Sequence, residues 1–334
     1  MDQYLFVGID VSSEELSVCL ERTADRHETF RVSNTPSGHR QLCKRLVRTK
    51  QRIRVGLEPS GPYSLAPALA LAKTPRVEVM LIPPRAAKDF AGALKHRSKT
   101  DALDARVLLE YVKRMEFRPW QPPGPERLAL QAIARRISAL TKTRAQERNR
   151  LHASSRQGHS SAVRRDLETH IRYLDKRIEN LKKQAGKLID KSTELSRALQ
   201  RLTSVRGIAE TSAILILAEI SLLPEEMTAR QWVAHAGLDP RHVQSGSSVQ
   251  RPARISRAGN RYLRTALYMP ALVAIRFEPY VRAFYQKLVA AGKAPMQANL
   301  AVMRKLLHSI HAMLAYDSPF QGEKFYPLAT IQGT

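Results

Sequence analysis

The chain has 334 residues, of which 43% are hydrophobic; this excludes a disordered polypeptide and leaves room for two or three folded domains. Its 55 Lys and Arg residues against 30 Asp and Glu residues give a formal net charge of +25. This charge indicates a polyanionic partner, nucleic acid first and an anionic membrane a distant second. Cys19 and Cys43 are too few for a disulfide framework or a zinc cluster. Since neither a basic signal-peptide region nor an apolar run of ~18 to 20 residues is found, we expect a cytoplasmic protein with no membrane partner.

Residues 1–118 are predicted to form an α/β domain. Apolar runs indicate five strands, at residues 4–9, 16–21, 27–32, 53–57 and 77–82. The first three strands form an antiparallel meander, and the Pro83-Pro84 pair is expected to end the fifth. Helices are expected at about 38–47, between the fourth and fifth strands, and over about 101–115. Strands followed by crossover helices predict a mixed sheet with helices on its flanks.

Residues 119–202 are predicted to form a linker and a coiled-coil arm. The proline-rich stretch 117–125 cannot continue a helix. A long helix is expected over about 126–151, a turn over 157–161, and then a second long helix whose apolar residues alternate in steps of four and three. These heptad residues are Leu167, Ile171, Leu174, Ile178, Leu181, Ala185, Leu188, Ser192, Leu195, Leu199 and Leu202. Two alternatives remain open: an antiparallel hairpin within the chain, and an arm that joins protomers.

Residues 203–334 are predicted to form a mainly α-helical domain. At its start, Val205–Ala209 and the apolar helix that follows are similar to a helix-hairpin-helix, which presents backbone amides and a helix N-terminus to a phosphate. Ala209 stands where a second glycine is usual, so a simple packed helical pair is the alternative.

Four acidic residues are notable in so basic a chain: Asp10, Glu58, Asp101 and Asp104. Asp10 and Glu58 each end a predicted strand, and Asp101 and Asp104, three apart, share a helix face. Two Mg²⁺ ions ~4 Å apart need several hard oxygen ligands, with positions left open for phosphate and nucleophile. A helix cap, a first-turn dipole contact or turn chemistry explains each acid singly. Together, in strand-strand-helix order, they indicate a ribonuclease-H-like or RuvC-like nuclease centre.

An arginine-rich segment follows in the C-terminal domain. Residues 240–277 contain no Asp, Glu or Lys but seven arginines: Arg241, Arg251, Arg254, Arg257, Arg261, Arg264 and Arg276. The planar guanidinium can grip a phosphate through two donors, so we interpret the segment as a phosphate-binding surface rather than a merely solvated basic loop. Within it, the stretch 245–248 reads as a polar turn, and a serine there becomes a candidate nucleophile if it can reach phosphorus.

With these residues in view, nearly the whole chain resembles the DEDD-type insertion-sequence transposases, the family numbered one hundred and ten. That family includes the bridge-RNA-guided DNA recombinases and the pilin-gene invertases. The similar N-terminal stretches are Gly8–Asp10, Glu58–Tyr63 and Lys99–Arg106. The similar C-terminal stretches are Ala236–Pro240, Ser245–Ser248, Ser256–Asn260 and Leu267–Ala271.

The resemblance implies a RuvC-like domain whose Asp10, Glu58, Asp101 and Asp104 bind Mg²⁺ or Mn²⁺. It also implies that Ser245, rather than Ser247 or Ser248, attacks DNA and forms a covalent phosphoserine intermediate. Donor and target DNA, a noncoding bridge RNA and a homo-oligomer, dimer or tetramer, are the implied partners in a bacterial or archaeal cell.

Two other functions are compatible with the sequence. One is a metal-dependent DNA nuclease in which water attacks, or a DNA invertase that needs no RNA guide. The other is a nucleic-acid-binding protein whose acidic cluster has no catalytic role. The complete set of four acids disfavours the second.

Overall fold

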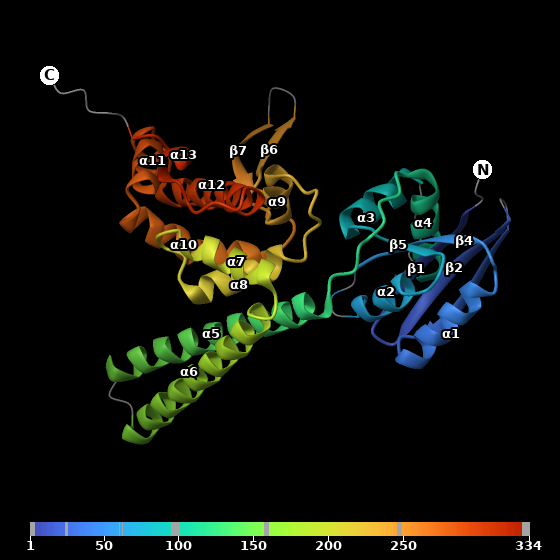
Figure 1. Cartoon of the computed structure of the whole chain (residues 1–334), viewed down its shortest axis with the longest axis horizontal. Coiled ribbons are helices and arrows are strands. Elements are labelled where there is room, and N and C mark those ends of the chain that lie inside the picture. The colour runs from blue at the N-terminus through green and yellow to red at the C-terminus, as the bar shows by residue number, and fades with distance from the viewer. Residues whose placement is uncertain are drawn as a thin grey trace. The chain divides into compact units, whose positions relative to one another are not determined.

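The computed structural model describes residues 4–23, 26–59, 61, 63–94, 101–156, 160–245 and 249–328; for residues 101–102, 155–156, 242–245 and 249–253 only the backbone is described. The chain divides into two compact units, Met1–Pro122 and Pro123–Thr334 (Figure 1). The three-part division at residues 118 and 202 stays a prediction.

The first unit is built on a five-stranded mixed sheet, as predicted. Its strands are β1 (Tyr4–Val11), β2 (Glu15–Thr23), β3 (Arg26–Ser33), β4 (Arg52–Leu57) and β5 (Val77–Leu81). Their order is β3-β2-β1-β4-β5, with antiparallel pairing among β1, β2 and β3 and parallel pairing of β4 with β1 and β5. The antiparallel meander is therefore confirmed.

Helices cover both faces of this sheet. They are α1 (Pro36–Val47), α2 (Leu65–Ala72), α3 (Pro84–Ala93) and α4 (Asp101–Arg114). Leu46 of α1 and Leu71 of α2 belong to the main core, whereas Leu108 of α4 packs with Ala87 of α3 in a separate cluster. Helix α3 was not predicted, because the Pro83-Pro84 pair was interpreted only as the end of a strand. Proline is in fact well suited to the first position of a helix, where no hydrogen bond from its nitrogen is needed.

Helix α4 lies against the two central strands without a gap. A Cβ atom added at Gly8 of β1 would stand 1.9 Å from the carbonyl oxygen of Ala105, and one added at Gly56 of β4 would stand 2.3 Å from Val112 Cγ2. Glycine at these two positions thus lets the backbones of helix and sheet approach closely.

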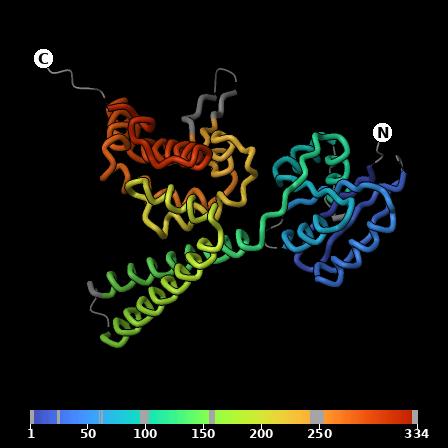
Figure 2. Tube along the Cα trace, in the orientation of Figure 1, coloured from blue at the N-terminus to red at the C-terminus, as the bar shows by residue number. Residues whose placement is uncertain are grey.

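The second unit begins with two long helices, α5 (Pro125–Arg156) and α6 (Ser161–Ile189), which Figure 2 shows side by side as an arm on a helical body. They run antiparallel, since Arg144 pairs with Asp175 at 2.6 Å and residues 137 and 140 pack with residues 174 and 178. The structure therefore shows the hairpin within the chain; that the arm also joins protomers stays a prediction. Part of the predicted turn, residues 157–159, lies outside the described residues.

The heptad pattern predicts one helix through Leu202, but the helix breaks before that. Helix α6 ends at Ile189, and α7 (Thr193–Thr203) starts after Ser192, whose side-chain oxygen caps it by accepting from the Leu195 amide at 3.3 Å. The apolar pattern continues across the break because Ile189 and Leu195 belong to the same core.

The body of the second unit is mostly helical, as predicted. Its helices are α7, α8 (Glu210–Ile220), α9 (Ala229–His235), α10 (Arg261–Phe277), α11 (Pro279–Ala290), α12 (Pro295–Ala315) and α13 (Gly322–Phe325), and a hairpin of β6 (Pro240–Ser245) and β7 (Val249–Ile255) is inserted between α9 and α10. The turn between α7 and α8 packs against α10: a Cβ at Gly207 would stand 2.7 Å from the Ala274 nitrogen. None of the described helices is both long and apolar enough to cross a membrane.

Candidate active site

One candidate region, within the first unit, is a sheet edge that carries Asp10 and Glu58. Strands β1 and β4 are parallel neighbours, and Ile9 lies opposite Leu57 in their register. Asp10 and Glu58 each follow by one residue, so the carboxyl ends of two adjacent strands bring both acids to the same edge. This is the edge at which α/β sheets commonly bind their ligands.

Helix α4 brings a third acid to this edge. Lys113, near its C-terminal end, forms an ion pair with Glu21, which lies beside the first half of β1 because Leu20 pairs with Val7. Ala105 lies over Gly8. Helix α4 thus runs antiparallel to β1, and its first turn, with Asp104, lies toward the Asp10 end of the strand. Asp101 begins the same helix, but its side chain is outside the described part.

The chemistry of these acids fits a divalent metal. Asp10, Glu58 and Asp104 are all partly buried, and carboxylate oxygens are the ligands that Mg²⁺ and Mn²⁺ prefer. Among the side chains that the structure describes, no three His, Cys, Asp or Glu groups come together closely enough to hold a metal ion. The fourth predicted ligand, Asp101, is not among those side chains.

Cys19 lies beneath the same helix but is not a candidate nucleophile. It is fully buried and packs with Ala105 and Leu109 of α4. Burial raises the pKa of its thiol to about 11, so the thiolate that a nucleophilic cysteine needs is not populated near neutral pH.

A second candidate region, within the second unit, is the β6–β7 hairpin, which was not predicted. Ser245 is the last residue of β6, and its backbone pairs with Val249. Arg241 lies opposite Arg254 in the ladder, and both side chains are exposed. The side chains of Ser245 and Arg251, and all of residues 246–248, lie outside the description. The hairpin therefore presents at least two guanidinium groups on the same short ribbon as the predicted nucleophile.

The base of the hairpin is held by polar contacts. The Ser256 hydroxyl donates to Asp239 Oδ1 at 2.5 Å, and the Ser256 amide donates to the Asp239 carbonyl at 2.9 Å. The next residue, Arg257, is exposed, has a positive φ of 54° and donates its amide to the Gly237 carbonyl at 3.2 Å. These contacts fix the point at which the ribbon leaves the body.

Two further predicted arginines lie on α10, directly after this loop. Arg261 is exposed and lies with its guanidinium 5.0 Å from the ring centre of Tyr262. Arg264 is partly buried and donates from Nη1 to the Ala236 carbonyl at 2.7 Å. Burial, reinforced by the neighbouring Arg257, lowers the pKa of Arg264.

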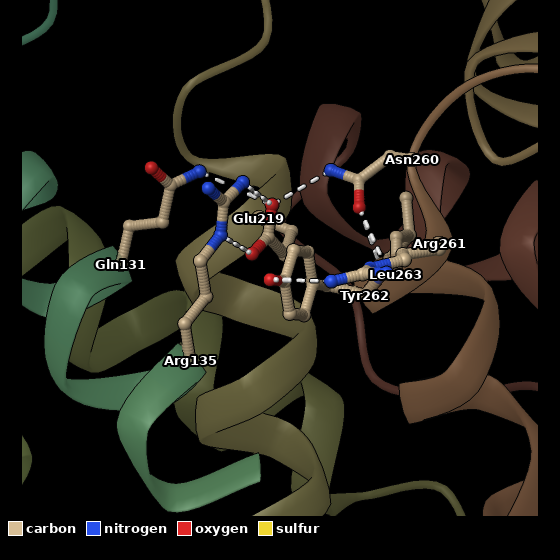
Figure 3. Close-up of polar contacts among 7 residues, drawn as sticks. All are labelled: Gln131, Arg135, Glu219, Asn260, Arg261, Tyr262 and Leu263. Atoms are coloured by element: carbon tan, nitrogen blue, oxygen red, sulfur yellow. Dashed lines mark hydrogen bonds and ion pairs between the residues drawn. The ribbon is translucent and has the colours of Figure 1, made fainter. Parts of the chain in front are cut away.

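Sequence reasoning missed a polar centre within the second unit, Glu219 of α8, which is 2% exposed (Figure 3). It accepts hydrogen bonds from Arg135 Nε at 2.8 Å and Nη2 at 3.0 Å, from Gln131 Nε2 at 3.1 Å and from Asn260 Nδ2 at 2.7 Å. Asn260 in turn caps α10, since its Oδ1 accepts from the amides of Tyr262 and Leu263. Glu219 therefore ties the arm helix α5 to the start of α10. The only sequence signal was a single acid inside the apolar run 212–220.

Comparisons with known proteins give the chain a family. A family model described as "Transposase" matches residues 7–158, and a model described as "Transposase IS116/IS110/IS902 family" matches residues 199–286. The pilin gene-inverting proteins of Moraxella bovis and Moraxella lacunata are each 27% identical to this chain, over 94% of this chain and 97% of their own length. A probable family 20 transposase of Pseudomonas aeruginosa is 27% identical over 59% of this chain and 64% of that protein.

The two matched regions contain the sheet with its acids and the hairpin with its arginines. The resemblance deduced from the motifs is thereby confirmed. This chain belongs to the IS110 family of transposases, which are enzymes of DNA recombination.

Proposed function

We propose that the chain is the transposase, a site-specific DNA recombinase, of an insertion sequence, and that it cleaves and rejoins DNA through a phosphoserine at Ser245. In this proposal the first unit is a RuvC-like domain in which Asp10, Glu58, Asp101 and Asp104 hold Mg²⁺ or Mn²⁺. The observation that supports it is that β1 and β4 end at the same sheet edge and that α4 runs antiparallel to β1, so that its first turn lies toward that edge.

The reaction has two balanced steps. Ser245 Oγ loses its proton and attacks the scissile phosphorus, so that an Oγ–P bond forms, the P–O3′ bond breaks and the leaving oxygen takes up a proton. A 3′-hydroxyl of the partner strand then attacks the phosphoserine, which restores a phosphodiester and frees the serine. A bound metal ion supplies positive charge that neutralises the phosphate and stabilises the charge that develops during transfer.

The arginines bind phosphate in this proposal. Arg241 and Arg254 on the ribbon and Arg257 at its base are exposed, so their guanidinium groups are available to DNA phosphates. Arg251, Arg261 and Arg264 complete the surface. Because no acid interrupts residues 240–277, the segment carries no internal competitor for these cations.

The proposed partners are donor and target DNA, a noncoding bridge RNA that selects sequence, and further copies of the chain joined as a dimer or tetramer through the arm. The family membership supports DNA as substrate, and the net charge of +25 suits both nucleic acids. The proposed working place is the cytoplasm of a bacterial or archaeal cell.

The test is the variant Ser245→Ala, with Ser247→Ala and Ser248→Ala as matched controls on neighbouring serines. We expect wild type and both controls to give a protein–DNA adduct that survives SDS, and Ser245→Ala to give none while it still binds DNA. An adduct retained in Ser245→Ala contradicts the assignment of the nucleophile.

A metal-dependent nuclease, or an invertase without an RNA guide, is the second candidate, and the names of the Moraxella relatives favour the invertase. A nuclease gives cut DNA that accumulates without an adduct and without joined strands. An invertase of this kind keeps its strand exchange after ribonuclease treatment, whereas an RNA-guided recombinase loses it.

A further inference from the structure

The outer face of α6 carries a line of five cations: Arg165, Arg172, Lys176, Lys183 and Lys187. Their spacings of 7, 4, 7 and 4 residues place them on one side of a helix with 3.6 residues per turn. All five are exposed, and the residues that continue the line between them, Thr169 and Asn180, are neutral. We call this set the α6 stripe.

The stripe faces away from the seam of the arm. On the opposite side of α6, Ile171, Leu174, Ile178 and Ala185 are buried. Since α6 packs against α5 through that side, the stripe is left as an uncovered face of the arm, which Figure 2 shows projecting from the helical body.

Several other cations of the arm are paired with acids. Arg148 pairs with Asp175 at 3.5 Å, Arg150 with Glu147 at 2.6 Å and Arg164 with Glu168 at 3.1 Å. No stripe residue forms an ion pair with any residue that the structure describes. The five cations of the stripe thus differ from these ion-paired cations of the same arm.

Within the stripe, the arrangement brings like charges close together. Arg172 and Lys176 are four residues apart, as are Lys183 and Lys187, and like charges at this spacing repel. An anionic partner removes that repulsion. A second copy of the same face would add to it, so the stripe does not suit pairing with itself.

The length of the stripe fits a duplex. Its 22-residue span, from 165 to 187, corresponds to about 33 Å at the α-helical rise. One turn of a DNA duplex is about 34 Å long, and the phosphates of DNA and RNA duplexes alike present a continuous line of negative charge.

We propose that the α6 stripe binds the sugar–phosphate backbone of a nucleic-acid duplex laid along the arm. This surface is separate from the arginines of residues 240–277 and from the predicted catalytic residues. The proposal shares with the proposed function only the premise that the partner is a nucleic acid, and it does not depend on Ser245, on the metal or on an RNA guide. DNA and an RNA stem offer the same backbone chemistry.

The experiment compares two triple variants of the full chain. Arg172→Gln, Lys176→Gln and Lys183→Gln neutralise the stripe, whereas Arg148→Gln, Arg150→Gln and Arg164→Gln remove the same charge from exposed but ion-paired positions of the arm. Affinity for a DNA duplex and for an RNA hairpin stem is measured by fluorescence anisotropy over a series of salt concentrations. Thermal unfolding of each variant establishes that the arm remains folded.

For the duplex that uses the stripe, we expect the stripe variant to bind at least about tenfold more weakly at low salt. The slope of log K against log salt should fall in magnitude by about 2.7, since each lost phosphate contact is worth about 0.9. The control variant should change affinity less than threefold. Loss for DNA alone or for the RNA stem alone identifies which backbone occupies the arm. A stripe variant that keeps the wild-type slope for both duplexes, or a control that loses as much, overturns the proposal.

Discussion

The sheet edge of the first unit and the hairpin of the second hold their predicted catalytic groups by different means. The edge belongs to a five-stranded sheet covered by helices, where Gly8 brings β1 directly against the backbone of α4. The hairpin is a two-stranded ribbon whose described anchors lie at its base, in the polar contacts of Asp239, Ser256 and Asn260. Packing positions the acids, and hydrogen bonds position the ribbon.

The difference corresponds to what each group has to do in the proposed reaction. Metal ligands work only within a few tenths of an ångström of an ideal distance, and a packed backbone supplies that accuracy. A nucleophile that first attacks DNA and later releases it has to meet two different strands. Glu219 accepts from Asn260 at the base of the ribbon and from Arg135 of the arm helix α5. The position of the ribbon is therefore linked to the arm, which also carries the α6 stripe.

The largest effect is expected where packing positions the acids. In Gly8→Ala, the new Cβ meets the Ala105 carbonyl oxygen at 1.9 Å and the Leu109 nitrogen at 2.4 Å, and backbone atoms cannot move aside cheaply. We expect a loss of about 3 kcal/mol in the free energy of unfolding. We also expect DNA cleavage to fall about 100-fold, because α4 moves away from Asp10. Thermal unfolding and a cleavage assay measure the two effects.

Gly92→Ala is the matched control, because a Cβ at this position of α3 meets nothing within 4 Å. It should leave cleavage unchanged and stabilise the protein by about 0.5 to 1 kcal/mol. Equal cleavage by the two variants would show that the contact between β1 and α4 does not position the acids.

A smaller effect is expected from Glu219→Gln. The neutral side chain keeps the size of Glu219 but leaves the guanidinium of Arg135 without its carboxylate, which costs about 1 to 3 kcal/mol. Because Asn260 loses a charged acceptor, we expect loosening of the 256–260 loop, a tenfold drop in adduct formation, and DNA affinity close to wild type. Hydrogen exchange of the loop amides and the rate of adduct formation are the measurements.

Glu194→Gln, on α7, provides the comparison, because Glu194 also pairs with an arginine of the arm helix α5. Glu194 accepts from Arg127 of α5 at 2.6 and 2.9 Å, but it is 68% exposed and does not contact the loop. Its loss should cost under about 1 kcal/mol and leave adduct formation intact. Asn260→Ser retains a cap for α10 but lacks the amide donor to Glu219, so it should behave like Glu219→Gln. If the loop amides of both variants exchange as in wild type, Glu219 does not hold the loop.

The sequence predicted the strands of the first unit but not the β6–β7 ribbon, and the difference lies in the hydrophobic pattern of each segment. Strands β1, β2, β4 and β5 were predictable because each carries a run of buried apolar residues, and the acids at the ends of β1 and β4 followed from that. The β6–β7 ribbon was not predictable: residues 240–255 are mostly Arg, Gln, Ser and Pro, without the alternation that a buried face imposes. The sequence of this ribbon therefore carries no hydrophobic pattern from which a pair of strands could be recognised.

The break between α6 and α7 and the role of Glu219 could not be predicted, because the residues concerned also fit a simpler interpretation. The leucines from 167 to 202 continue one pattern through two helices, and only the capping role of Ser192 marks the break. Glu219 became a structural centre only when α5 and α10 came together from 84 and 41 residues away. A buried ion pair between distant segments has no local signature.

The smallest expected effect is on the pH dependence of stability. It can be measured for each unit separately, because each unit contains a histidine whose pKa is lowered. Burial lowers the pKa of His39 in the first unit and of His235 in the second, where the nearby Glu219 opposes the shift. An unfolded histidine has a pKa near 6.5, so below about that pH the unfolded chain binds more protons than the folded one. The contribution of each neutral histidine to the free energy of unfolding is therefore complete above about pH 6.5. It is lost as the pH falls toward the pKa that the histidine has in the folded protein, by at most about 1.4 kcal/mol per pH unit for each histidine.

The two tryptophans allow each unit to be followed alone, since Trp120 packs on the core of the first and Trp232 is buried in the second. Trp232→Phe leaves fluorescence that reports the first unit, and Trp120→Phe leaves fluorescence that reports the second. We expect urea midpoints to fall between pH 7.5 and 5.5 in both, and His39→Gln to flatten the fall only in the Trp120 signal. His235→Gln should flatten only the Trp232 signal. A midpoint that is independent of pH, or a histidine variant that flattens both signals equally, would contradict the assignment of His39 to the pH dependence of the first unit and of His235 to that of the second.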